Sequence, residues 1–524
     1  MSKRLILILA LAFVVGITFA AYAEVQNVKV SGDITVSAVG RDNYDLAKSL
    51  SGNAIINSNF EDKDRDILSI TRVRVDADLT DNVSATVRLL NERPWNGESR
   101  SEGQANRNIG LTASNTAAEA NEIDLDLAYV TLKEFLYSPL SLSIGRQELH
   151  FGNDLIVGDP DTNGYSLRTA LSEGDLSARK SFDALRATLD YNPIVVDLVY
   201  ARTEAGAANL HANTDLAGIN ASYALNNNTT IEGFFFSKMK GSNTPAVYNV
   251  DAADNTGWTG AAVGAGLDNQ NYKDRSDIVN TLGVRAVDKT VKNLTLDGQI
   301  AWQFGRYNPK FDPNARYDAA SFVKAQTVSR NAWAAQLMGS YDLKDIAMLS
   351  KYSPSISASY TYLSGADRDQ TTKRSYKGWD PMFENQTIGQ VMNGIFADTN
   401  MHKAGLSAKA KLTDDIGAKL DYVGAWFAKS YPGGDNHRKA ILSGYAAASG
   451  TAGDSGRQFY LLDGNYIGSE VDATLTYDYT EDVQFSLLGG VFFVGKNIRD
   501  ADHIATKDNK ANAAELIGSM KVTF

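Results

Sequence analysis

Residues 293–306 alternate apolar and polar side chains over a longer stretch than a strand of a soluble sheet usually does. The apolar positions are Leu294, Leu296, Gly298, Ile300, Trp302 and Phe304. Successive side chains of a strand point to opposite faces, so this segment has one apolar and one polar face. Soluble strands average about five or six residues, whereas a tilted strand needs roughly 9–11 residues to cross a bilayer. The length, and the aromatic pair that ends the apolar face, are typical of a membrane-spanning strand.

The same alternation recurs in about eighteen segments of the chain. These segments are residues 28–40, 68–79, 83–91, 123–133, 140–148, 182–191, 194–202, 216–225, 230–237, 278–287, 293–306, 331–341, 355–364, 403–412, 416–428, 468–479, 483–495 and 515–524. Strands can cross a membrane only when the sheet closes, because lipid cannot satisfy an open edge. The sequence therefore predicts an all-β, transmembrane antiparallel β-barrel of about eighteen strands.

The connections between these segments alternate in length. Tight turns such as 80–82 and 226–228 are rich in Asn and Asp, and long polar stretches such as 92–121 and 239–277 lie between them. Outer-membrane barrels have short periplasmic turns and long extracellular loops. We therefore expect an even strand number, with both termini on the periplasmic side. The terminal Phe524 resembles the assembly signal of bacterial outer-membrane proteins, so the barrel assembly machinery is an expected partner.

The N-terminus predicts export. Lys3 and Arg4 precede an apolar run at 5–21 that ends in Ala21-Tyr22-Ala23. A basic n-region, a short apolar region and an A-x-A site describe a secretory signal peptide. We expect residues 1–23 to be removed and residues 24–524 to form one barrel in the outer membrane of a Gram-negative-type bacterium. An uncleaved membrane helix is the alternative interpretation of 5–21.

Composition excludes several function classes. The chain has Cys 0, so neither disulfides nor thiol chemistry are available to it. The net charge is -11 and becomes -13 without Lys3 and Arg4, which argues against a nucleic-acid partner. No Ser/His/Asp spacing supports hydrolysis, so we expect no enzymatic activity.

Parity assigns charged side chains to the inside of the barrel. On 68–79, Val73 and Val75 face lipid while Arg72 and Arg74 face the lumen. On the other strands, the charged side chains that alternate with apolar ones in the same way face the lumen too: Arg88, Arg186, Arg285, Lys403, Lys409, Lys411 and Lys419. Two interpretations stay open. The arginines form a track for anions, since a guanidinium matches a carboxylate, or they neutralise acidic residues in ladders that hold the barrel's shape. Because Asp76 and Asp78 lie nearer the periplasmic turn, we expect the arginines to be partly uncompensated.

One short motif resembles a known family. The strand end Ile144-Gly145-Arg146-Gln147 is followed by Phe151-Gly152 and by Leu155-Ile156-Val157. A strand ending in G-R-Q, an aromatic–Gly pair and an apolar run resemble the alginate export porins of Gram-negative outer membranes. The resemblance implies an eighteen-stranded barrel whose arginine-lined constriction passes an anionic uronate polymer, and it adds Arg146 to the pore arginines.

The chain departs from the family pattern at two places. Strict parity puts Arg146 with Leu142 and Ile144 on the lipid side, unless a bulge at Gly145 turns it inward. The family's long last periplasmic turn is here only 480–482, and the longest periplasmic link is instead 342–354.

A calcium loop is the one cofactor site that the sequence suggests. Asp159, Asp161 and Asn163 precede Gly164, like the start of such a loop. The closing Glu is absent, since Ala170 stands at the twelfth position, and a plain Asx-rich turn is the alternative. We expect no other cofactor.

Together these observations predict a passive, monomeric outer-membrane channel for an anionic polysaccharide or oligosaccharide, surrounded by lipopolysaccharide and outer-membrane lipid. The alternatives are a small-solute porin and a non-conducting surface or adhesion barrel.

Overall fold

The computed structural model describes residues 27–44, 46, 63–95, 123–161, 174–204, 213–241, 276–307, 328–366, 375–430, 459–461, 464–500 and 510–524. The expected signal peptide, residues 1–23, lies outside these residues.

Within the described residues, eighteen long strands form the wall. They are β1 (Asn27–Asp42), β2 (Lys63–Thr80), β3 (Val83–Pro94), β4 (Asp124–Leu132), β5 (Leu140–Glu148), β6 (Ser181–Asp190), β7 (Ile194–Glu204), β8 (Thr214–Ala224), β9 (Thr229–Lys240), β10 (Asp277–Asp288), β11 (Leu294–Tyr307), β12 (Val328–Asp342), β13 (Ser355–Leu363), β15 (Met401–Lys411), β16 (Ile416–Phe427), β18 (Tyr466–Asp478), β19 (Val483–Val494) and β21 (Ala513–Thr523). The shorter elements are β14 (Ser375–Tyr376), β17 (Phe459–Leu461), β20 (Ile498–Asp500), the helix α4 (Gln390–Ile395) and the 3-10 turns η3 (Gly174–Leu176) and η5 (Ser350–Tyr352).

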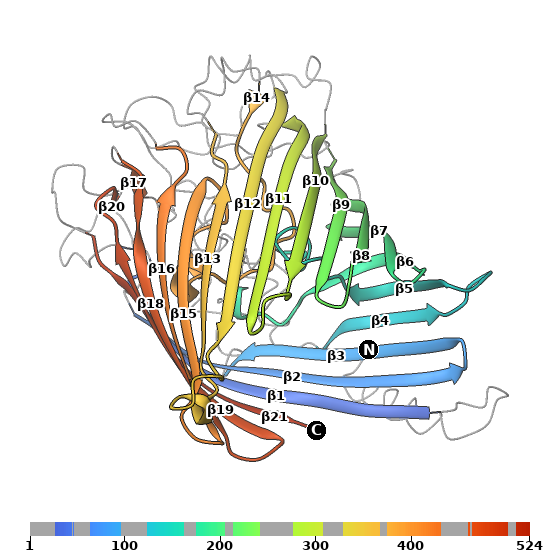
Figure 1. Cartoon of the computed structure of the whole chain (residues 1–524), viewed down its shortest axis with the longest axis horizontal. Helices are drawn as coiled ribbons and strands as arrows, with labels where there is room; N and C mark the ends of the chain where they lie inside the picture. Colours follow the sequence, from blue (N-terminus) through green and yellow to red (C-terminus); the bar gives the residue numbers. More distant parts are fainter. Residues whose placement is uncertain are drawn as a thin grey trace, which may run out of the picture.

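The wall is a closed antiparallel barrel (Figure 1). Each wall strand pairs with the next one in the chain, and β21 pairs with β1. Gly32 donates to the carbonyl of Phe524 at 2.8 Å and accepts its amide at 3.0 Å, so the last residue helps to close the ring. β14 adds to β12 in parallel, and β17 pairs with β20 in a small separate sheet. The predicted fold and even strand number are confirmed.

The alternation in the sequence corresponds to the two faces of the wall. Val73 and Val87 are 36% and 40% exposed on the outer face, while Arg74 and Arg88, in register with each other, lie on the lumen face. On β11 and β12, Trp302 stacks on Trp333 with ring centroids 6.0 Å apart. An outer apolar band with aromatic residues at its border is the surface that lipid requires. No described helix has the length and apolarity needed to span a membrane.

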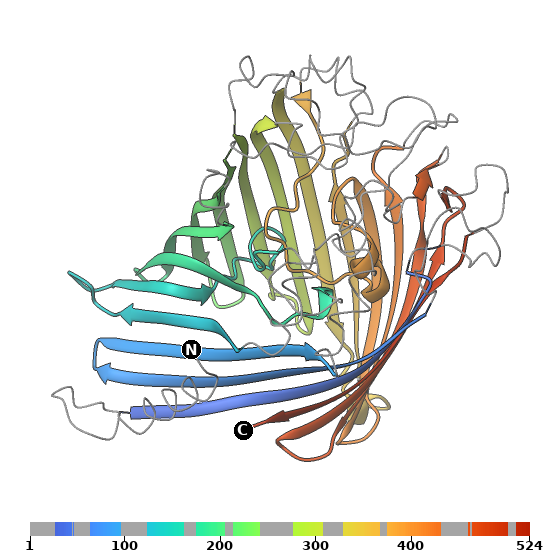
Figure 2. The same ribbon diagram turned by 180° about the vertical axis from the view of Figure 1, so that it is seen from behind.

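Two segments that the sequence assigned to extracellular loops instead lie against the inner wall. Residues 149–161 and the first part of 375–400 pack on lumen-facing apolar side chains of β6 to β13. Helix α4 packs on the lumen face of β15 to β21. Figure 2 shows the teal loop and the orange helix inside the ring of strands. These two segments, which connect strands of the wall, therefore narrow the lumen from two sides.

Candidate lumen site

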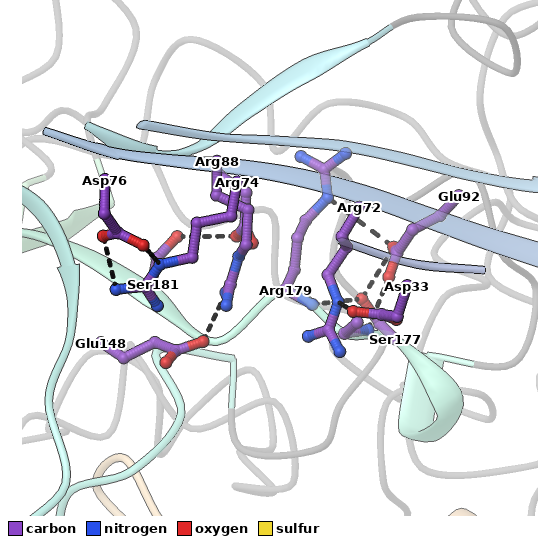
Figure 3. A network of polar contacts seen from close by, with 12 residues as sticks. Asp33, Arg72, Arg74, Asp76, Arg88, Glu92, Glu148, Ser177, Arg179 and Ser181 are labelled. Carbon is purple, nitrogen blue, oxygen red and sulfur yellow. Dashed lines mark hydrogen bonds and ion pairs between the residues drawn. The ribbon is translucent and has the colours of Figure 1, made fainter. Parts of the chain in front are cut away.

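The predicted pore arginines of β2 lie on the lumen face, each beside a carboxylate (Figure 3). Arg72 Nε donates to Asp33 of β1 at 2.9 Å. Arg74 binds both oxygens of Asp76, at 2.7 and 2.9 Å, and Thr86 donates to the same carboxylate at 2.7 Å. The side chains of Arg72 and Arg74 are 24% and 36% exposed. Both guanidinium groups therefore reach the lumen while they are ion-paired.

Arg88 has a different role. Its Nε donates to Asp126 at 2.6 Å, and its Nη2 donates to Glu148 of β5. Ser181 of β6 also donates to Asp126, at 3.2 Å. The side chain of Arg88 is only 9% exposed, so on the lumen face it is covered by its partners and ties β3 to β4 and β5. Breaking a buried ion pair by removing one partner typically costs about 3–5 kcal/mol.

The two remaining predicted lumen arginines are also paired. Arg186 Nε donates to Asp197 at 2.8 Å, and its guanidinium lies 5.4 Å from the ring centroid of Phe151. Arg285 binds Asp297 through two bonds of 2.7 and 2.9 Å and Glu232 through one of 3.1 Å.

The expectation that mid-strand arginines are partly uncompensated is wrong. It placed Asp76 too far toward the periplasm, but residues two apart on one strand share a face, and their side chains meet there. In the described part of the chain, each of the five lumen-facing arginines above has a carboxylate partner.

Arg146 does not join them. It is in register with Ala128 and with Asp183, and its Nη1 lies 3.4 Å from Asp183 Oδ1. It shares the parity of Ile144, which is 42% exposed on the outer wall. Gly145 does have an irregular backbone, with a φ of 125°, but this leaves Arg146 on the outer face. The sequence parity, and not the family pattern, gives its position.

Two lumen lysines have no acidic partner among the described residues. Lys409 and Lys411 lie at the end of β15 that leads into the short turn 412–415. Both are exposed. Lys409 is in register with Lys419, whose Nζ lies 2.9 Å from Asp421. The predicted lumen residue Lys403, by contrast, is buried and pairs with Asp398.

The two inward segments are joined to each other. Phe383 donates its amide to the carbonyl of Ile156 at 3.1 Å, and its carbonyl accepts from Gly158 at 2.7 Å and Asp159 at 3.0 Å. The ring of Phe383 meets Phe182 of β6 edge-on, with centroids 5.8 Å apart. Phe383 thus connects residues 149–161 and 375–400 to the wall and to one another.

Polar anchors hold the second segment. Asp380 binds Lys238 of β9 at 2.6 Å; burial opposes its ionisation, yet Lys238 and Arg330 outweigh burial and hold its pKa at about 2. At helix α4, the amides of Val391 and Met392 each donate to a carboxylate oxygen of Glu470 at 2.8 Å.

Glu384 is a buried carboxyl between the inward segments and the wall. It is 3% exposed. Burial raises the pKa of Glu384 well above its ordinary value, and the neighbouring Asp398 raises it further, against an opposing effect of Lys403. Residues 375–400 therefore carry a carboxyl group, that of Glu384, into a buried position where it resists ionisation.

The predicted calcium ligands are arranged differently. Asp159 is fully buried, its Oδ1 accepts the amide of Asp161 at 2.8 Å, and its Oδ2 accepts from Lys180. Asn163 lies outside the described residues. Within the described residues, no group of three His, Cys, Asp or Glu side chains is placed to hold a metal ion. The calcium site stays a prediction.

Sequence reasoning missed the inward segments, although one signal pointed to them. Residues Phe234, Phe235 and Phe236 of β9 are consecutive, so both faces of that strand are apolar. Phe234 and Phe236 are buried in the cluster that receives the first segment. A lumen-facing apolar wall requires a cover, because water would otherwise contact it.

Comparison with known proteins places the chain. The chain is similar to solved Pseudomonas aeruginosa structures: OccK3 (OpdO), with 8% identity, 96% of this chain and 97% of that chain covered, and a TM-score of 0.48; and OccK8 (OprE), with 10% identity, 95% and 98% covered, and a TM-score of 0.49. A third, OccK2 (OpdF) in complex with glucuronate, has 9% identity, 95% and 99% covered, and a TM-score of 0.48. No curated protein matches. The family model described as alginate export matches residues 52–512, and the chain therefore belongs to the alginate export family of outer-membrane channels.

Proposed function

We propose that this outer-membrane channel passes an anionic polysaccharide or oligosaccharide of the uronate class out of the periplasm. The observation that carries the proposal is the pair Lys409 and Lys411, exposed at the periplasmic end of the lumen and without an acidic partner in the described part of the chain. Membership in the alginate export family supports the same substrate class.

The lysines suit the first contact with a polymer that arrives from the periplasm. An ammonium group on a flexible stem acts as a point charge and accepts many carboxylate geometries. Lys409 and Lys411 are two positions apart on β15 and share a face, so their side chains present a local excess of positive charge. That excess raises the local concentration of anions at the entrance.

Further along, the paired arginines can exchange partners. Arg74 and Asp76 are both about one-third exposed, and such pairs contribute only about 0.2–1 kcal/mol. A uronate carboxylate can replace Asp76 on Arg74 at little net cost, because an ion pair is present before and after. Weak successive contacts of this kind permit passage, whereas one tight site would hold the polymer.

The test is single-channel conductance with uronate oligomers added on the periplasmic side at low salt. We expect the oligomers to block the current transiently, neutral oligosaccharides of equal length to block less, and the block to weaken as ionic strength rises. Lys409→Gln with Lys411→Gln should reduce the blocking rate, while Lys292→Gln, on the turn before β11 and outside the lumen, should not. Equal block of the double variant and the parent would refute the entrance role.

A small-solute porin is a second candidate, favoured by the inward segments that narrow the lumen. A length series of uronates separates the two functions, because a small-solute porin passes monomers and excludes long oligomers. The monomeric state and the role of the barrel assembly machinery stay predictions. Family and fold are those of transport proteins rather than of enzymes.

A further inference from the structure

A row of four charged side chains of alternating sign crosses the wall from β5 to β8. Arg146 is in register with Asp183, Asp183 with Arg202, and Arg202 with Asp215. Arg202 Nε donates to Asp215 at 2.9 Å, and Arg146 Nη1 lies 3.4 Å from Asp183. We call these four residues the outer charged row.

The row faces away from the lumen. Arg146 and Asp183 share the parity of Ile144 and Leu185, whose side chains are 42% and 47% exposed on the outer wall. Asp183 and Arg202 are themselves 63% and 48% exposed. Arg146 and Asp215 are less exposed, at 21% and 22%, so the middle of the row is the part most open to the surroundings of the barrel.

The row also marks a level in the membrane. All four residues lie within two positions of the strand ends that lead into the long connections 149–180 and 205–213. A charge on the outer wall is costly at the bilayer midplane and nearly free at the interface. The row therefore lies at the extracellular interface, among lipid headgroups.

The other half of the rim has a different chemistry. On β11 and β12, Trp302 stacks on Phe304 and Trp333. On β13 and β15, the Tyr360 hydroxyl bonds His402 Nδ1 at 2.6 Å. Aromatic side chains are the common interfacial anchors. A further outward ion pair, Arg65–Asp42 at 2.7 Å, lies on β1 and β2, so these charged pairs lie on one side of the barrel.

The two arginines of the row keep unused hydrogen-bond donors. Among the described residues, the Arg146 guanidinium makes one side-chain contact, from Nη1 to Asp183, and it is long at 3.4 Å. Its Nε is buried, so the terminal nitrogens are the donors that can reach a ligand outside the wall. A guanidinium presents five donors in a fork that matches phosphate oxygens. Neighbouring strands are about 4.8 Å apart, so Arg146 on β5 and Arg202 on β7 are about 10 Å apart.

We propose that Arg146 and Arg202 bind the phosphate groups of an anionic lipid headgroup in the outer leaflet. The interfacial level puts the row beside such headgroups, the arginine forks fit phosphate, and Asp183 between them keeps the two cations separate. The site lies outside the channel and does not depend on what the channel transports.

The test measures binding of diphosphoryl lipid A to the purified barrel by native mass spectrometry in detergent, with phosphatidylethanolamine as the zwitterionic comparison. We expect Arg146→Gln with Arg202→Gln to lower the apparent affinity for lipid A at least about tenfold, the scale of one charged hydrogen bond. Arg306→Gln is the matched control, since Arg306 is exposed on the outer face of β11 and its Nη2 bonds Ser276.

Three outcomes would overturn the proposal: parental lipid affinity in the double variant, an equal loss in Arg306→Gln, or a change in oligomeric state of the double variant without a change in lipid binding. The last would make the row a contact between copies of the chain. Circular dichroism and heat-dependent gel mobility check folding. The quadruple variant that adds Asp183→Asn and Asp215→Asn restores the row's net charge of zero and should still fail to bind.

Discussion

The Asp76→Asn substitution separates a selective lumen wall from a structural ladder. It removes one negative charge from the lumen and keeps the shape of the side chain. The amide oxygen can still accept from Arg74, whose bonds to Asp76 are now 2.7 and 2.9 Å. Because Arg74 is 36% exposed, the freed positive charge acts directly on passing ions.

The magnitude follows from Coulomb's law. A unit charge about 8 Å from an ion contributes about 0.5–1 kcal/mol at an effective dielectric constant of about 40–80. That energy raises the local concentration of anions by a factor of about two to five and lowers that of cations by the same factor. At 0.1 M salt the Debye length is about 10 Å and the effect survives, whereas at 1 M it is about 3 Å and the effect is screened.

Reversal potentials in a salt gradient measure the change. We expect Asp76→Asn to shift selectivity toward anions at low salt and Arg74→Gln to shift it toward cations. Asp345→Asn makes the same chemical change on an exposed periplasmic turn, where Asp345 pairs with Lys292 at 2.7 Å, and should leave selectivity unchanged. Shifts of the same sign for both lumen variants, or shifts that persist at 1 M salt, would refute the reasoning.

Three further predictions concern the inward segments and the wall. Phe383→Ala removes a buried aromatic anchor at a cost of about 3–5 kcal/mol and should give larger, noisier single-channel currents, whereas Phe485→Ala on the outer wall should not. The pKa of Glu384 is raised in the docked segment, so docking is most stable below the ordinary value of 4.5 and weakens as pH rises through the raised value; conductance should grow over that range, and Glu384→Gln should abolish the dependence. Gly145→Ala places a Cβ 2.1 Å from the carbonyl oxygen of Ala128 at a φ of 125°, so its yield of heat-resistant barrel on gels should fall; a yield equal to the parent's would contradict the strain argument.

The wall could be predicted from the sequence because its rule is local. Lipid requires an apolar face and the lumen tolerates a polar one. The sequence of each strand alone therefore shows which of its side chains face lipid and which face the lumen. Predicted and observed strands agree closely at most ends, as in 355–364 against β13 (Ser355–Leu363). The outward position of Arg146 followed from the same parity.

The inward segments could not be predicted in this way, because their position depends on contacts that are distant in sequence. Phe151 meets Phe236 with ring centroids 5.1 Å apart, and Asn153 donates to Gln336 at 2.7 Å. Parity says which face a side chain takes, but it does not say which loop covers that face. The pairing of Arg74 with Asp76 could not be predicted from parity for a related reason. Parity places both side chains on one face, but it does not say how far each side chain reaches along that face.

The compensated arginines change the expected mode of transport. A bare arginine in a narrow lumen would bind a carboxylate strongly, and a polymer with one carboxylate on each sugar would be held at many points at once. An arginine that already has a partner, as Arg74 has Asp76, offers the polymer only the difference between two similar ion pairs. That difference is small and can be of either sign, so each contact is short-lived. Uncompensated charge is then most useful at the entrance, where Lys409 and Lys411 lie. There a change of electrostatic potential attracts the polymer into the channel. Along the rest of the lumen a nearly constant potential lets the polymer move on.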